Sequence, residues 1–435
     1  MTKRFSIKAW AWPVMCGALL LTAFATPRSD GAGMALLLMG LTAIVCAAAW
    51  AVRMPEGPAL SRRRQLLYVV GAAAGLAVLL LLQPWILMLT AGHSGHNGLY
   101  DPSRAVLEYL KLAGVVCAFA FGFRVSMSDD TARRCMDAVL AVGGIWAFVS
   151  IITFVADPEG IYRSMSIGQQ GRLTAALSSA NSAGTLFGAL SVMACGHLLN
   201  RFWNRTGRLW VERIDPFSLI VFGVSLTALV MTLSRGAITV TAACLVVEVI
   251  VLSWNRVRLR WLLTGVATSA AALVALTLTP LLGLAQRLQN VDVDNQSRQL
   301  IYGEHLKVVG HQLWFGSGFG SFAAVNNAIL TELNYGYLFN IRAMHNIYLQ
   351  WLEECGLVGL IVLIGLNLAI LSPVFLAAGR RRTMGGRLWA ILLAYAVFLL
   401  HGLTDYGFQE PALEIFIALV LGQGLAIATN NRQVA

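Results

Sequence analysis

Long apolar stretches recur along almost the whole chain, and this pattern limits the possible folds more than any other feature. A helix needs about 20 apolar residues to cross about 30 Å of hydrocarbon, and such windows follow one another between residues 10 and 429. Because 57% of the residues are apolar and only 12% are charged, a soluble domain could not bury these segments. The sequence therefore predicts an all-α integral membrane protein that forms one polytopic domain over residues 1–435.

The hydropathy pattern predicts about twelve transmembrane helices. Basic residues precede the first apolar run as in a signal peptide, but further spans follow at once, so we expect this run to be a retained helix. A partly helical loop at 285–343 is expected between the ninth and tenth spans. The predicted spans are 9–25, 33–52, 66–90, 105–123, 136–156, 177–199, 217–233, 237–254, 261–284, 356–378, 388–404 and 411–429.

The net charge of +11 follows membrane topology. Of the 32 Lys and Arg residues, 22 lie at the two termini and in alternate loops. Basic residues gather on the cytoplasmic side of spans, so we expect both termini in the cytoplasm and the 285–343 loop on the opposite face. This distribution indicates contact with membrane lipids and gives no reason to expect a nucleic-acid partner.

Several basic residues break this rule, because the topology places them on the outer face. Arg172 precedes the sixth span, Arg235 lies in a tight turn between two spans, and Arg298 lies in the long loop. A guanidinium group often extends toward lipid headgroups, but the turn around Arg235 offers no loop for its side chain. Converging guanidinium groups suit phosphate oxygens, so an anionic ligand would explain all three.

His345 lies on the same expected face, just before the tenth span. A neutral imidazole beside such arginines can accept a proton from an attacking hydroxyl. A histidine at the end of a span is also often only a structural hydrogen-bond partner, so spacing alone leaves both roles open.

The long loop shows a helical stripe of apolar residues from Ser297 to Phe315, which predicts an amphipathic helix at the membrane surface. Asp294, Asn295 and Ser297 are expected to cap it. His305 and His311 would then lie on a surface helix. His345 to Glu354 predicts a second short helix that leads into the tenth span and is broken at Gly356 and Gly359.

Other candidate sites are weaker. His93 and His96 have a spacing that suits a metal, but no third ligand is near them in the sequence. Glu108 and Lys111 are three residues apart in the fourth span and are expected to form an ion pair. No nucleotide-binding fingerprint is present, so we expect no cofactor and no metal.

An ordered set of motifs gives the chain a resemblance to a known family. The set comprises Arg172-Leu173 with Asn181-Ser182-Ala183-Gly184, Ser234-Arg235-Gly236-Ala237, Ser297-Arg298, Trp314 to Phe322, and His345-Asn346-Ile347-Tyr348-Leu349 with Glu354 and Gly356. Over residues 170–360 this order resembles the O-antigen ligase and polymerase superfamily of bacterial membrane enzymes.

The resemblance implies a glycosyltransferase of the inner membrane with a periplasmic active site. It would use a glycan linked to undecaprenyl diphosphate and transfer it with inversion, without a metal, to an acceptor hydroxyl. Arg172, Arg235 and Arg298 would bind the diphosphate and His345 would activate the acceptor. The motifs also suggest supporting roles for Asn181, Ser234, Asn346, Glu354 and Asp405.

The choice within the family stays open. A ligase joins the glycan to a lipid A core, whereas a polymerase extends it by another repeat. Asp405, Gln409 and Pro411 resemble the Asp-x-x-x-Gln-x-Pro ending of exopolysaccharide polymerases, which favours a polymerase slightly. A flippase or transporter of lipid-linked glycan is the alternative of another class, but such proteins commonly show paired repeats, and we find none.

Overall fold

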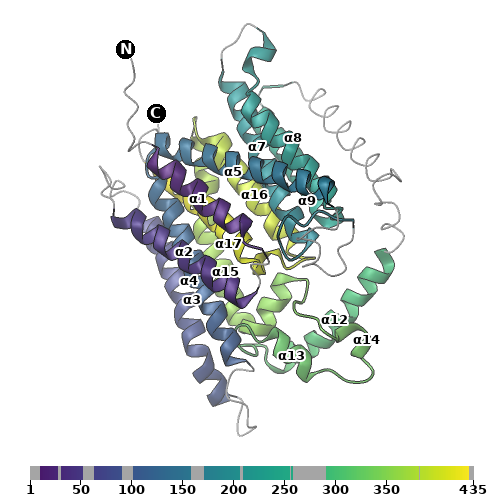
Figure 1. Ribbon diagram of the computed structural model, residues 1–435. Coiled ribbons are helices and arrows are strands. Elements are labelled where there is room, and N and C mark those ends of the chain that lie inside the picture. The colour runs from purple at the N-terminus through teal and green to yellow at the C-terminus, as the bar shows by residue number, and fades with distance from the viewer. Residues whose placement is uncertain are drawn as a thin grey trace.

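The computed structural model describes residues 10–27, 31–51, 63–90, 101–157, 171–205, 209–254, 256–257, 291–381 and 383–430. Within these ranges the regular structure is entirely helical (Figure 1). The apolar helices are α1 (Ala11–Ala25), α2 (Ala32–Ala51), α3 (Arg63–Thr90), α4 (Pro102–Val125), α5 (Asp129–Ala156), α7 (Ala180–Asn204), α8 (Pro216–Met231), α9 (Arg235–Ser253), α15 (Ile347–Arg380), α16 (Gly385–His401) and α17 (Pro411–Thr429).

The predicted spans coincide with these eleven helices wherever the structure describes the chain. Eight of them are long and apolar enough to cross a membrane, and α1, α8 and α16 are shorter apolar helices. The ninth predicted span, 261–284, lies outside the described residues. The described residues therefore confirm an all-α fold, and the length and composition of its helices are consistent with an integral membrane protein, while the number of twelve spans stays a prediction.

Two helices form the centre of the bundle. Nearly every residue of α7 and α17 is buried among the surrounding helices. At the crossing of α4 and α17, a Cβ on Gly122 would lie 2.1 Å from the Leu419 carbonyl oxygen, and one on Gly422 would lie 2.1 Å from the Phe119 carbonyl oxygen. Small residues thus let the two backbones touch, which is how membrane helices gain packing energy without a hydrophobic effect.

Three of the basic loops, 124–135, 200–216 and 379–387, meet at one end of the bundle. Arg381, after α15, binds Asp129 at the start of α5 at 2.5 Å, and Asn430, after α17, donates to the same carboxylate at 3.2 Å. Between α7 and α8, Arg201 pairs with Asp215 at 2.8 Å. The described ends of the first and last helices also share this end, because Trp10 packs against Arg134 near the start of α5.

The opposite end carries the helices of the long loop: α12 (Val291–His311), α13 (Phe322–Ala328) and α14 (Tyr335–Leu338). They lie beside one end of the membrane helices (Figure 1). The expected helix start is wrong, because α12 begins at Val291 and the proposed caps Asp294, Asn295 and Ser297 lie inside it. Short polar residues are favoured at helix caps but can also lie inside a helix. The sequence pattern therefore predicts a helix start that is too late.

The expected surface position of His305 is also wrong. Its side chain is fully buried, with Nδ1 2.6 Å from a carboxylate oxygen of Glu353 and Nε2 3.2 Å from Oδ1 of Asn326. Its ring stacks on Phe322. This histidine therefore joins α12 to α13 and α15. His93 and His96 lie outside the described residues.

Helix α15 is interrupted at Gly356, as predicted, where φ is +67°; Gly359 is helical. The interruption releases the Glu353 and Glu354 carbonyls, which accept from the backbone N–H groups of Ser317 and Gly318 at 2.8 and 3.0 Å. In return, the N–H groups of Leu357 and Val358 bind the carbonyls of Leu313 and Trp314. The 313–318 loop therefore replaces the missing helix hydrogen bonds, so no backbone group among them is left unpaired.

Candidate active site

His345 lies in the short segment that connects α14 to α15. Its neighbours are fixed on both sides: the Met344 N–H donates to Gln350 Oε1 at 3.1 Å, and Asn346 caps α15 by accepting from two N–H groups of its first turn. Tyr302 of α12 donates its hydroxyl to the His345 carbonyl at 3.1 Å. The segment is therefore held in place while the imidazole remains partly accessible, with 29% of the side chain exposed.

The imidazole of His345 faces the loop between α16 and α17. Its Nδ1 atom lies 3.8 Å from Oδ1 of Asp405, and its ring contacts the Tyr406 ring edge to face at a centroid distance of 4.9 Å. No hydrogen bond is formed by Nδ1, although this atom is buried. The carboxylate therefore favours the tautomer with a proton on Nδ1, which leaves Nε2 as the basic nitrogen.

A chain of polar contacts links this carboxylate to Arg172. Asn181 of α7 donates its amide to Asp405 Oδ1 at 3.3 Å and accepts from a terminal guanidinium nitrogen of Arg172 at 2.8 Å. The Nε atom of Arg172 also donates to the Thr232 carbonyl at 2.9 Å. Arg172, Asn181, Asp405 and His345 thus come together from three distant parts of the sequence.

Asp405 is buried but remains charged. Burial alone would raise its pKa, but the neighbouring imidazoles of His345 and His401 and the Asn181 amide favour the carboxylate, and together they lower the pKa of Asp405 below its usual range. Burial, followed by the charge of Asp405, raises the pKa of Tyr406 to about 12. A permanent negative charge therefore lies next to His345.

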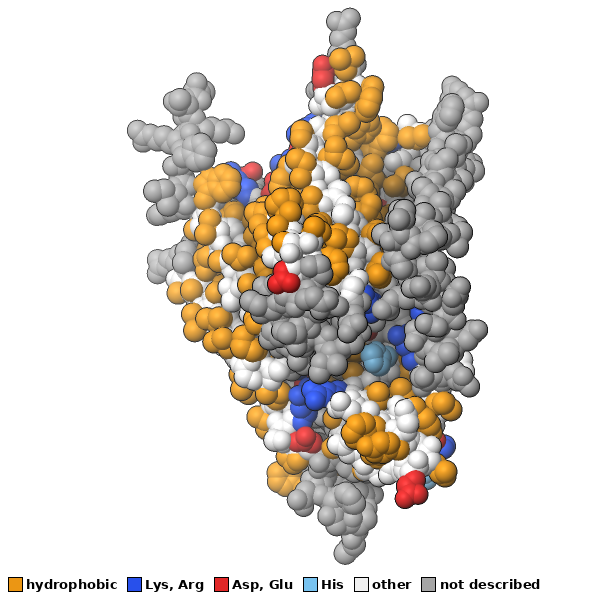
Figure 2. All heavy atoms as spheres, turned by 45° about the vertical axis from the view of Figure 1, so that its right-hand side comes forward, with side chains coloured by type: hydrophobic (Ala, Val, Ile, Leu, Met, Phe, Trp, Pro, Cys, Tyr) orange, Lys and Arg blue, Asp and Glu red, His pale blue; other side chains and the backbone are white. Residues whose placement is uncertain are grey.

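The structure places Arg235 and Arg298 at the edge of the same group. Arg235 begins α9, and a Cβ on the next residue, Gly236, would lie 3.0 Å from the ring of His401. Arg298 lies one helical turn before Tyr302, and its charge acts on both Tyr302 and His401. Basic and histidine side chains accordingly gather in the middle of one face of the molecule (Figure 2).

The backbone around this group is strained. Among the described residues, those with positive φ other than glycine all belong to segments that build the site: Ala175, Ala176, Leu233, Asn340 and His345. Such conformations cost about 1–3 kcal/mol each and persist only where the surroundings impose them. The fold therefore uses part of its stability to hold these segments in place.

The remaining predicted residues have supporting positions. Asn346 acts as the cap already described. Ser234 is buried, and its backbone N–H donates to Thr232 Oγ1 at 3.2 Å. Glu354 is buried in α15 and accepts from the Gly320 N–H at 2.8 Å and from Gln350 Nε2 at 2.9 Å, so it fixes the glycine-rich turn.

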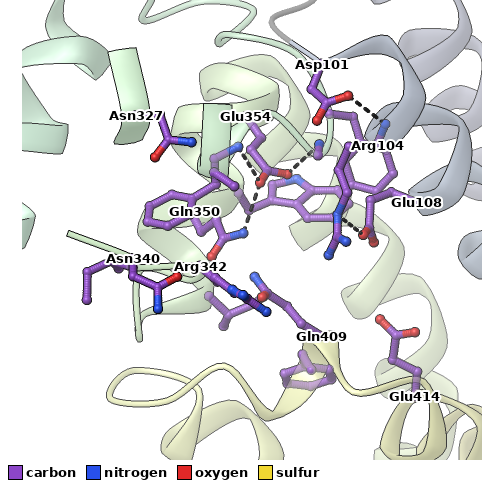
Figure 3. A pocket seen from close by; sticks show the side chains of 18 residues that line it. Asp101, Arg104, Glu108, Asn327, Asn340, Arg342, Gln350, Glu354, Gln409 and Glu414 are labelled. Atoms are coloured by element: carbon purple, nitrogen blue, oxygen red, sulfur yellow. Dashed lines mark hydrogen bonds and ion pairs between the residues drawn. The ribbon is translucent and has the colours of Figure 1, made fainter. Parts of the chain in front are cut away.

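A cavity of about 500 Å³ adjoins the segments that carry His345 and Asp405. Arg342 and Ile347 line it on one side, and Phe408 and Gln409 on another. Figure 3 shows Asp101, Arg104 and Glu108 of α4 across from Gln350 and Glu354 of α15, with Gln409 and Glu414 nearby. Arg104 binds Glu108 at 3.1 Å, and Glu108 also pairs with Lys111 at 3.0 Å, as the spacing in α4 predicts.

Sequence reasoning missed several residues of this region. Tyr302, Tyr406 and Glu414 lie within ordinary helical or loop patterns, and no spacing distinguishes them. Gln83 in α3 was missed for the same reason, although it is buried and donates to the carbonyls of Phe315 and Glu354 at 2.7 and 2.6 Å. Its only signal is that an amide in an apolar span needs a partner.

Among the residues that the structure describes, no cluster of three or more His, Cys, Asp and Glu side chains could hold a metal ion. A comparison with curated proteins found no match. A comparison with protein families gave a match over residues 220–364 to the O-antigen ligase family. This range contains Arg235, Arg298, His345 and Glu354, and the match supports the resemblance to the O-antigen ligase and polymerase superfamily.

Proposed function

We propose that the protein transfers a glycan from a polyprenyl diphosphate carrier to an acceptor hydroxyl on the periplasmic face of the bacterial inner membrane. The observation that carries this proposal is the contact chain from His345 through Asp405 and Asn181 to Arg172. This chain of contacts joins His345, the candidate base, to Arg172, a candidate residue for binding the diphosphate. The family match supports a lipid-linked glycan and an acceptor in general terms.

In the proposed step, Nε2 of His345 accepts the proton of the acceptor hydroxyl while the oxygen attacks the anomeric carbon. Asp405 stabilises the imidazolium that forms, through Nδ1. The bond between the anomeric carbon and the diphosphate breaks, and the diphosphate leaves with both electrons. Attack from the opposite face inverts the anomeric centre.

The leaving diphosphate needs positive charge more than it needs a proton. We assign this role to Arg172, Arg235 and Arg298, whose guanidinium groups suit phosphate oxygens and require no metal ion. Preorganised charges of this kind contribute about 3 kcal/mol each, which corresponds to roughly a hundredfold in rate.

We place the acceptor glycan in the cavity next to His345. Its amide and carboxylate groups can bind sugar hydroxyls, and Phe319, Trp351 and Phe408 offer apolar surfaces for sugar rings. The Oε2 atom of Glu414 is buried there without a hydrogen-bond partner. A sugar hydroxyl would supply one.

Glu414→Gln tests this placement, because the amide keeps the size of the side chain but replaces one carboxyl oxygen with an NH2 group, which cannot accept a hydrogen bond. We expect the KM for the acceptor to rise about tenfold with the KM for the donor unchanged, a cost typical of one such bond. Glu332→Gln is the matched control, since Glu332 is exposed in the outer loop away from the cavity. Equal acceptor KM values for both variants would refute the placement.

Purified protein in liposomes tests the catalytic assignment. His345→Ala should abolish transfer of glycan while the lipid-linked donor still binds, and Arg235→Ala should weaken donor binding. Normal transfer by the His345 variant would show that another group is the base. A transporter would instead move the glycan across the liposome membrane, and neither the wild type nor the variant would transfer it to an acceptor.

We favour a polymerase over a ligase, because Asp405 belongs to the His345 network and Gln409 of the same motif lines the cavity. Cells that carry only the His345→Ala form distinguish the two. Loss of a polymerase leaves single repeats on the surface, whereas loss of a ligase leaves full-length glycan on its carrier lipid.

A further inference from the structure

A second group of arginines lies at the end of the bundle opposite His345. Helices α7 and α16 both run between the two ends: Asn181 and His401 belong to the active site, whereas Arg201 and Arg387 lie at the other end of the same helices. There, a cavity of about 490 Å³ is lined by Arg133, Arg201, Arg205 and Arg387, with Asn204 and Thr383.

The positive charge of this cavity exceeds the negative charge beside it. Arg201 pairs with Asp137 and Asp215 at 3.0 and 2.8 Å, and Arg205 shares Asp215 at 2.9 Å. Two carboxylates thus face four guanidinium groups. Water screens this surplus positive charge only in part, because protein forms the cavity wall and partly shields the charges.

Arg387 shows that the cavity lacks a partner. Its side chain is only 6% exposed, yet its Nε atom has no hydrogen-bond acceptor. The one bond of its terminal nitrogen is to Nε2 of His197, at 2.9 Å, and this partner carries no negative charge when neutral. The carboxylates of Asp137 and Asp215 act on Arg387 through their charge but leave its buried Nε–H without an acceptor. Because a buried donor without an acceptor is costly, an anion in the cavity would both bind this N–H and offset the surplus positive charge.

A second cavity indicates what kind of anion fits. It has a volume of about 500 Å³ and shares Asn200 and Asn204 with the arginine cavity. Its wall combines the apolar side chains of Ile250, Leu252 and Trp389 with the basic side chains of Arg256 and Arg381. Trp254 at the end of α9 is 60% exposed beside it. Basic side chains next to apolar ones match a molecule with a phosphate head and a hydrocarbon tail.

We infer that these adjoining cavities, between α5, α7, α9 and α16, form a binding site for an anionic phospholipid, with the phosphate bound by Arg133, Arg201, Arg205 and Arg387 and an acyl chain lying against Ile250, Leu252 and Trp389. The phosphate supplies an acceptor for the Arg387 guanidinium and offsets the surplus positive charge. The bound phospholipid also fixes the starts of α5 and α16 relative to the end of α7. The site is separate from the proposed glycan-transfer site.

Binding of defined lipids to the purified protein tests this site. The probes are phosphatidylglycerol, phosphatidylcholine and inorganic phosphate, and the readouts are retained lipid in native mass spectrometry and the Tm of the protein in detergent. Phosphatidylglycerol should bind and raise the Tm, and binding should weaken with salt. Phosphatidylcholine should have little effect because its choline group cancels the charge of the phosphate, and inorganic phosphate should have little effect because it has no acyl chain.

Arg133→Gln should weaken phosphatidylglycerol binding about fivefold, as expected for one arginine near a lipid phosphate. Arg387→Gln should weaken phosphatidylglycerol binding more. If this buried substitution prevents folding, Arg133→Gln tests the site by itself. Arg134→Gln is the control, because Arg134 pairs with Asp130 at 2.9 Å outside the cavity. Equal binding by the two Arg→Gln variants at 133 and 134 would overturn the site, and equal effects of inorganic phosphate and phosphatidylglycerol would overturn its assignment to a lipid. These readouts are independent of glycan transfer.

Discussion

At the scale of single residues, the site depends on a buried carboxylate that stays charged. Asp405 is 1% exposed, and its second oxygen, Oδ2, has no hydrogen-bond partner among the described residues. The nearby imidazoles and the Asn181 amide offset the cost of burying the charge. In the proposed reaction, Asp405 would therefore act through His345, as a positioning residue.

Asp405→Asn should lower the rate of glycan transfer on the order of 100-fold, because the imidazolium loses its stabilising charge. Donor binding should change far less. Single-turnover transfer and equilibrium donor binding, measured on the same purified protein, separate the two effects. A parallel loss of both would mean that Asp405 mainly supports Arg172 through Asn181.

The lowered pKa of Asp405 also gives a pH dependence with a definite sign. The folded state binds this proton more weakly than the unfolded state, so the resulting stability is present above the unfolded pKa of about 3.9 and is lost as pH falls through the lowered value. The Tm of the wild type should therefore fall more steeply than that of Asp405→Asn below about pH 4. Parallel Tm curves in that range would contradict the assignment.

Sequence reasoning selected Arg172, Asn181, His345 and Asp405 from an ordered set of motifs, and the structure brings these side chains together, while their roles stay predictions. The same reasoning was less informative about burial. It failed for His305, because a histidine on a helical stripe looks the same in sequence whether it faces water or a buried glutamate. Burial of a polar residue depends on partners from distant segments, which no local pattern contains.

At the scale of elements, the interruption of α15 determines the shape of the outer loop. A Cβ on Gly356 would lie 2.4 Å from backbone atoms of Trp314 and Phe315, and one on Gly316 would lie 2.5 Å from the Glu353 carbonyl oxygen. Both glycines have positive φ. Helix and loop can therefore exchange hydrogen bonds only if no side chain is present at these two positions.

Gly356→Ala should lower the Tm of the protein and abolish most of the transfer activity, because the left-handed backbone alone costs about 1–2 kcal/mol and the methyl group displaces the loop. Gly365→Ala is the control in the same helix, where a Cβ meets no atom within 4 Å and φ is helical. An unchanged Tm for Gly356→Ala would show that the interruption is not needed.

Sequence patterns predicted the break at Gly356 but not its partner. The glycine-rich turn from Gly316 to Gly320 was visible as a breaker, yet the pairing of its backbone with α15 spans more than 30 residues of sequence. The start of α12 was misplaced because capping residues are equally at home inside a polar helix. Hydropathy therefore predicts where the helices form, but it does not predict which segments they contact.

At the scale of the whole molecule, the two ends of the bundle differ in chemistry. One end carries the proposed active site and helices α12 to α14, and the other carries the arginine cavity and the described ends of the first and last helices. The distribution of basic loops predicts that the first end faces the periplasm.

Cysteine labelling tests this orientation. The seven native cysteines are buried or half-buried, so background reaction should be low. Leu333→Cys in the outer loop and Leu209→Cys near the opposite end introduce thiols at positions that are 95% and 60% exposed. A membrane-impermeant maleimide should label position 333 in intact spheroplasts and position 209 only after lysis. The reverse order would place the site in the cytoplasm.

The exchange of hydrogen bonds at Gly356 has a consequence for attempts to change the specificity of the proposed glycan transfer. The turn at 313–320 is bound by α15 through its backbone and by α3 through Gln83, whose oxygen accepts from the Phe319 N–H at 3.1 Å. A loop grafted from a relative would face the backbone carbonyls of α15 and the amide of Gln83 in this protein, to which its own backbone is not matched. Chimeras should therefore exchange the loop together with the facing turns of both helices, as one inherited unit.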